Sequence, residues 1–154
     1  MHARLGFALP SDYRAFIDAY GPGTFGDIRI AAPGAPGEMD LFALLGRKYN
    51  QVRYLPRTEL DPPYYPELGG TICCAETTGG YTCGWAPVRP VPDQWTVVAI
   101  APSPALNTHS LQANLSFTTT LKQHAEQKPG MKGGLLPPRD PSAGPVTFTP
   151  YTSG

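Results

Sequence analysis

The stretch TICCAETTGGYTCGW, residues 71–85, predicts a β-hairpin and decides the fold class. Two runs of strand-forming residues, Thr71–Glu76 and Tyr81–Trp85, flank a turn at Thr77–Gly80. Adjacent glycines supply the positive φ that tight hairpin turns require. The β-branched run Trp95–Ile100 follows shortly after and predicts a further strand. The middle of the chain therefore favours an antiparallel sheet.

A helix is predicted upstream of this hairpin, from about Pro10 to Tyr20. Its apolar residues recur at i, i+3, i+4 and i+7, which is one stripe of a helix. These residues are Tyr13, Phe16, Ile17 and Tyr20. Pro10 or Ser11 suits the first turn, and Gly21 followed by Pro22 ends the helix.

The remaining elements complete the predicted order. Thr24–Ile30 is predicted as a strand, with Ile28 and Ile30 on one face. Asp40 is predicted to cap a helix that runs to about Tyr54, with the basic residues Arg47, Lys48 and Arg53 in solvent. A weaker strand is expected at Thr108–Ala113 and a closing helix at Ser116–Gln127. Helices around a run of adjacent strands indicate an α+β fold with an antiparallel sheet of about 4–6 strands.

The composition changes near residue 127. We expect one domain over residues 1–127, followed by a Pro/Gly-rich tail over residues 128–154 that is flexible or extended. Within this tail, Val146–Thr149 is the part that suits an edge strand.

Charge and cysteine usage limit the function classes. The chain has 154 residues, with 12 Lys and Arg against 12 Asp and Glu, so it lacks the basic field of a general nucleic-acid binder. No apolar run approaches the roughly 20 residues of a membrane span. The first residues lack the apolar segment of a signal peptide. Three cysteines in one short segment do not form a secreted disulfide framework, so a cytoplasmic protein is expected.

Catalytic motifs are absent from the sequence. There is no Gly-x-Ser-x-Gly elbow and no phosphate-binding glycine loop. Cys73, Cys74 and Cys83 lack the spacing of a zinc site and are interpreted as small core residues. We therefore expect no catalytic residue, metal or cofactor. A Cys/His-dependent enzyme, using Cys83 or Cys73 with a histidine such as His109, is the least favoured alternative.

Aromatic and acidic residues gather in the segment from residue 59 to residue 81. Such aromatic residues anchor protein interfaces, whereas Trp85 and Trp95 are assigned to the core. The predicted partner-binding residues are Glu59, Asp61, Tyr64, Tyr65, Glu67, Glu76 and Tyr81.

Several short motifs, in order, resemble the SUKH superfamily. The opening LPSDYRAF at residues 9–16, which runs on to Tyr20-Gly21-Pro22-Gly23, is similar to that family's first helix and turn. Gly69–Ile72, Trp85, Asp93–Val98 and Ser116-Phe117 resemble its hairpin, next strand and last helix. The resemblance spans about residues 5–127 and omits the tail.

This resemblance implies a non-enzymatic role. Bacterial SUKH proteins are mostly immunity proteins that bind and neutralise polymorphic toxins, often nucleases. A Pro/Gly/Ala-rich composition in which Arg exceeds Lys indicates a GC-rich bacterial source. The expected partner is a cognate toxin protein, without direct binding of nucleic acid or membrane, and the expected state is a monomer or weak homodimer. The alternative is a scaffold or regulatory protein-binding domain of the same fold, as in the yeast cell-wall-assembly regulators of this superfamily.

Overall fold

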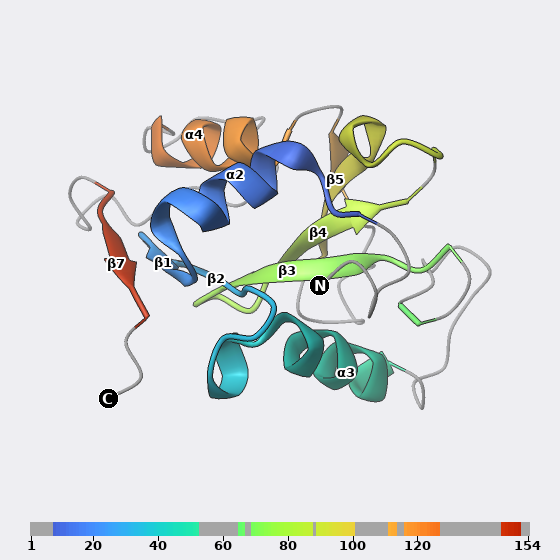
Figure 1. Ribbon diagram of the computed structural model, residues 1–154, viewed down its shortest axis with the longest axis horizontal. Helices are drawn as coiled ribbons and strands as arrows, with labels where there is room; N and C mark the ends of the chain where they lie inside the picture. The colour runs from blue at the N-terminus through green and yellow to red at the C-terminus, as the bar shows by residue number, and fades with distance from the viewer. Residues whose placement is uncertain are drawn as a thin grey trace.

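An antiparallel sheet organises the molecule (Figure 1), and it has seven strands in the described part of the chain. The computed structural model describes residues 8–52, 65–66, 69–87, 89–100, 111–113, 116–126 and 146–151. The strand order is β6-β5-β4-β3-β2-β1-β7. The strands are β1 Gly23–Phe25, β2 Ile28–Ile30, β3 Ile72–Thr77, β4 Thr82–Ala86, β5 Thr96–Ile100, β6 Leu111–Ala113 and β7 Phe148–Pro150.

Among the described residues, three helices cover the two faces of this sheet. Helices α2 (Ser11–Tyr20) and α4 (Phe117–Glu126) lie together on one face, and α3 (Leu41–Val52) lies on the other (Figure 1). Two short 3₁₀ helices, Gly37–Met39 and Pro92–Gln94, precede α3 and β5. The predicted α+β fold with an antiparallel sheet flanked by helices is confirmed: six strands come from residues 1–127 and the seventh from the tail.

The predicted strand Thr24–Ile30 is instead two strands, and this prediction was wrong. Gly26 adopts a φ of 63° and turns the chain, so β1 and β2 form an antiparallel hairpin around Gly26 and Asp27. The alternation of Ile28 and Ile30 inward with Arg29 outward is retained in β2. A glycine followed by aspartate between apolar residues is a turn signal, and it overrides the continuous strand pattern.

Aromatic side chains that pack together under α2 and α4 form one part of the core. Tyr13 and Trp85 are buried, with their ring centroids 5.0 Å apart, and Phe117 lies 5.4 Å from Tyr13. The Tyr13 hydroxyl donates a hydrogen bond to the Ala31 carbonyl (2.5 Å). Both tryptophans are buried, as predicted, and Trp95 donates its indole N–H to the Arg89 carbonyl.

Residues distant in sequence hold the ends of α2 and α4. The backbone N–H and hydroxyl of Ser11 both donate to the Asp93 carboxylate, at 2.6 and 2.9 Å. Asp12 in turn accepts hydrogen bonds from the backbone N–H (2.8 Å) and hydroxyl (3.2 Å) of Thr118, in the first turn of α4. These carboxylates satisfy N–H groups that a helix leaves free at its N-terminus, so the two helices are fixed to each other and to the sheet.

Candidate functional site

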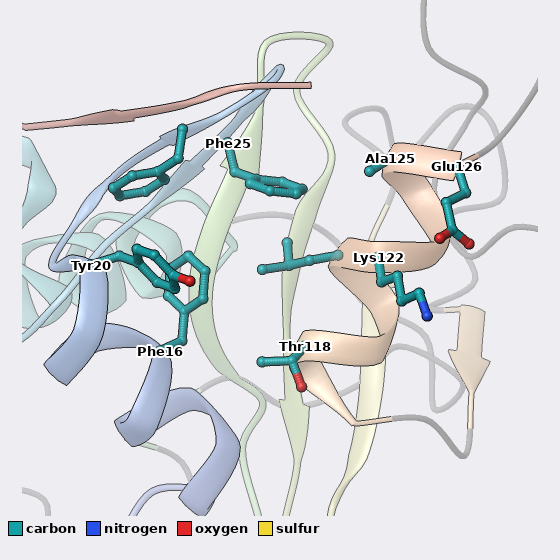
Figure 2. A pocket seen from close by; sticks show the side chains of 9 residues that line it. Phe16, Tyr20, Phe25, Thr118, Lys122, Ala125 and Glu126 are labelled. Atoms are coloured by element: carbon teal, nitrogen blue, oxygen red, sulfur yellow. The ribbon is translucent and has the colours of Figure 1, made fainter. Parts of the chain in front are cut away.

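An open apolar pocket of about 420 Å³ lies between α2 and α4 (Figure 2). Figure 2 shows Phe16, Tyr20 and Phe25 on one side and the α4 residues on the other. The pocket is lined by Phe16, Tyr20, Phe25, Thr118, Leu121, Lys122, Ala125, Glu126 and Phe148. Its volume falls within the range of pockets that bind small molecules.

Four aromatic side chains line this pocket. Phe16 and Tyr20 come from the apolar stripe of α2, Phe25 from β1 and Phe148 from β7. The Phe16 ring lies 5.1 Å from that of Tyr20 and 5.7 Å from that of Phe148, measured between centroids. Tyr20 is 59% exposed, more than any other large apolar side chain recorded for the described residues. A large exposed aromatic beside an apolar hollow is the arrangement typical of an interface anchor.

Helix α4 supplies the polar rim. Lys122 and Glu126 lie one turn apart on the same side of α4, and Thr118 lies one turn before Lys122 (Figure 2). Both charged side chains are largely exposed. Helix α4 therefore places one cation and one anion beside an apolar floor, which suits a partner that carries both apolar and charged side chains.

A buried histidine anchors the far end of α4. The Nε2 atom of His124 lies 2.8 Å from Oδ1 of Asp27, in the β1–β2 turn, and the His124 side chain is only 3% exposed. A carboxylate accepts hydrogen bonds, so the proton of this bond is on Nε2. No partner for Nδ1 is found among the described residues. The pair joins α4 to the β1–β2 turn.

The structure describes three of the seven predicted partner-binding residues. Tyr65 and Tyr81 are half-buried and pack against the core, and the Tyr65 N–H donates to the Thr71 carbonyl. The third described residue is Glu76, whose carboxylate pairs with basic side chains. The other four, Glu59, Asp61, Tyr64 and Glu67, lie outside the described residues.

Glu76 lies on the opposite face of the sheet from the pocket and is surrounded by three cations. Its carboxylate is 2.6 Å from Lys48, 3.2 Å from Arg29 and 3.3 Å from Arg47. Burial alone raises the pKa of Glu76, but the hydrogen bond and charge of Lys48, with the charges of Arg47 and Arg29, lower it overall. Lys48, predicted to be in solvent, has a side chain only 14% exposed, because it is drawn to Glu76. The structure thus gives Glu76 an intramolecular role.

The thiols are buried in the sheet. Burial raises the pKa of Cys73 and of Cys83 to about 12, and it raises that of Cys74 well above its ordinary value. A thiol with such a pKa is protonated at neutral pH and is a poor nucleophile. His109, the histidine considered as a partner for Cys83, lies outside the described residues. Among the residues that the structure describes, no group of three or more His, Cys, Asp or Glu side chains is placed to hold a metal ion.

Comparisons with protein-family models, curated proteins and solved structures find no match to this chain. The described helices include none that is both long and apolar enough to cross a bilayer. Sequence reasoning missed the four pocket aromatics as a group. Two signals were present: Tyr20 stands at the exposed end of an apolar helical stripe, and Phe148 stands in the segment suited to an edge strand.

Proposed function

We propose that this chain is an immunity protein that binds a cognate bacterial toxin in a stoichiometric complex and neutralises it. The observation that carries the proposal is the open aromatic pocket between α2 and α4, with Tyr20 exposed at its rim. The motif resemblance to the SUKH superfamily and the α+β fold support the choice of partner class. The buried, protonated thiols favour binding over thiol-dependent catalysis.

The pocket suits a protein partner for energetic reasons. An inhibitor that outcompetes a toxin's substrate needs a nanomolar or tighter complex, about −12 kcal/mol or beyond. A few aromatic anchors in desolvated pockets supply most of such binding energy. Burial of the exposed part of Tyr20, together with an apolar side chain of the toxin entering beside Phe25, provides an anchor of this kind.

The direct test is protection of cells. Any toxin encoded near this gene is expressed from an inducible promoter, with and without the full chain, and growth is followed. The full chain is expected to restore growth, and Tyr20→Ala is expected to restore it poorly at equal protein level. Val91→Ala is the matched control, because Val91 is also an exposed apolar side chain (50%) but lies away from the pocket.

The outcomes separate the two protein-binding hypotheses. Absence of protection against any toxin encoded nearby would contradict the immunity role. In that case, a stable complex with a non-toxin protein that is weakened by Tyr20→Ala would support the scaffold or regulatory role instead.

A further inference from the structure

The edge strand β7 is a short segment seated on β1. It pairs antiparallel with β1, with Phe148 opposite Phe25 and Pro150 opposite Gly23. Two backbone hydrogen bonds extend the pairing, from the Gly26 N–H to the Thr147 carbonyl (3.0 Å) and from the Tyr151 N–H to the Pro22 carbonyl (2.9 Å). The six described residues 146–151 thus occupy an edge that is otherwise open for strand addition.

Gly23 makes room for the aromatic ring of this segment. Its backbone is not in the left-handed region, so conformation does not require glycine. A Cβ atom at Gly23 would lie 2.5 Å from Cζ of Phe148 and 2.5 Å from the Thr149 carbonyl oxygen. The β1 edge is therefore shaped to receive a strand that carries an aromatic side chain at the position of Phe148.

The segment fills this site only in part. Phe148 is half-buried, Thr149 and Pro150 are exposed, and the pocket of about 420 Å³ remains open beside the Phe148 ring. Tyr20, whose ring is 5.7 Å from that of Phe148, stays 59% exposed. A strand with further apolar side chains facing α4 would bury surface that residues 146–151 leave in water.

The outer edge of β7 is a poorer place for a new strand. Pro150 has no backbone N–H, and proline at a sheet edge is a recognised obstacle to further pairing. A partner strand therefore gains more by taking the place of residues 146–151 on β1 than by adding to β7.

We propose that the β1 edge is a strand-receiving site, occupied in the free protein by residues 146–151, where a protein partner inserts an extended segment with an aromatic side chain in the place of Phe148. Main-chain pairing with Gly23–Phe25 supplies affinity, and the ring over Gly23 supplies specificity. The proposal goes beyond the proposed function, since it concerns how any protein partner engages this edge.

The test uses the full chain and a fluorescein-labelled peptide copy of residues 146–151, VTFTPY, followed by fluorescence anisotropy. The wild-type chain is expected to bind the peptide weakly, because its own segment competes at a high effective concentration. Phe148→Ala weakens that competitor and is expected to bind the peptide about tenfold or more tightly. The peptide with alanine in place of phenylalanine is expected not to bind this variant.

Two further variants separate the site from a general loss of structure. Gly23→Ala in the Phe148→Ala background is expected to abolish peptide binding, because its Cβ occupies the place of the ring. Gly46→Ala in the same background is the matched control, since nothing lies within 4 Å of a Cβ at Gly46. If Phe148→Ala does not fold, as judged by circular dichroism, Thr149→Pro is used in its place. Thr149→Pro removes the backbone N–H at position 149 and keeps the Phe148 ring.

Either of two results overturns the proposal. One is a failure of the variants to change peptide binding: Phe148→Ala or Thr149→Pro binds the peptide no more tightly than the wild type, or adding Gly23→Ala does not weaken that binding. The other is a wild-type dimer in light scattering that the peptide dissociates, because the occupant would then be residues 146–151 of a second copy. Neither result depends on the identity of a toxin, so failure here leaves the protection assay to judge the immunity role.

Discussion

Replacing Glu76 with glutamine removes one negative charge from the centre of three cations and keeps the size of the side chain. Lys48 lies 2.6 Å from the carboxylate, and Arg29 and Arg47 lie 3.2 and 3.3 Å away. The amide oxygen of glutamine still accepts a hydrogen bond, but the amide nitrogen is a donor and faces cations. The change therefore tests the electrostatic part of the cluster and disturbs its packing little.

The magnitude follows from the exposure of each partner. The side chains of Glu76 and Lys48 are 13% and 14% exposed, whereas those of Arg29 and Arg47 are 46% and 33% exposed. Solvent-exposed ion pairs contribute about 0.5 kcal/mol, and breaking a buried pair costs about 3–5 kcal/mol. With one largely buried pair and two screened ones, Glu76→Gln is expected to lower the free energy of unfolding by about 2 kcal/mol at neutral pH. In a domain of this size, that lowers Tm by about 4–8 °C.

The pH dependence has a definite sign. The pKa of Glu76 in the folded protein is lowered from 4.5, so its contribution to stability is complete above that value and is lost as the pH falls through the folded-state pKa. The stabilities of the wild type and Glu76→Gln are therefore expected to differ at pH 7 and to converge as the pH falls below 4.5 and through the folded-state pKa of Glu76.

Urea denaturation followed by tryptophan fluorescence measures this difference, since Trp85 and Trp95 are both buried. Glu38→Gln is the matched control: Glu38 lies 3.9 Å from Arg29 but is 77% exposed, so a loss below about 0.5 kcal/mol is expected. A Glu76→Gln protein as stable as the wild type at pH 7, or a gap that persists unchanged at low pH, would refute the reasoning.

Three further predictions concern the core and the helix ends. Asp12→Ala is expected to lower the free energy of unfolding, measured by heat or urea, by about 1 kcal/mol, because the Thr118 N–H loses its acceptor. Asp18 is exposed on the same helix, so Asp18→Ala is expected to lower it much less. Gly84→Ala is expected to lower the free energy of unfolding by about 3 kcal/mol or to prevent folding, because its Cβ would collide with the Ile72 carbonyl. Gly46→Ala is expected to raise the free energy of unfolding by up to about 1 kcal/mol, because alanine suits the interior of α3 better than glycine. In a thiol-labelling assay at pH 8, the three cysteines should react only after unfolding, because all are buried and protonated; rapid labelling of the folded chain would contradict this.

The elements with strong local signals were predictable from the sequence. The apolar stripe that begins at Tyr13 and the stop at Gly21 predicted α2 to within a residue. The double glycine at residues 79–80 and the β-branched run before Ile100 predicted the β3–β4 hairpin and β5. The suitability of Val146–Thr149 for an edge strand is confirmed by β7, which begins at Phe148.

The site was not predictable to the same degree, because long-range packing creates it. Tyr20 and Phe148 are 128 positions apart in the sequence, and only the pairing of β7 with β1 brings their rings to 5.7 Å. Glu76 was grouped with acidic neighbours in sequence, but the sheet turns its side chain toward α3, where Lys48 lies. The direction of a strand side chain depends on register, and a one-residue irregularity, as between Cys73 and Ala75, changes it.

The central claim is that this protein acts by binding a toxin through the pocket between α2 and α4. The decisive measurement is isothermal titration calorimetry of the purified full chain with each candidate toxin encoded near its gene. We expect a 1:1 complex of nanomolar or tighter affinity for the wild type. The affinity is expected to be about tenfold or more weaker for Tyr20→Ala and unchanged for Val91→Ala. The absence of binding, or equal affinities for the wild type and Tyr20→Ala, would contradict it.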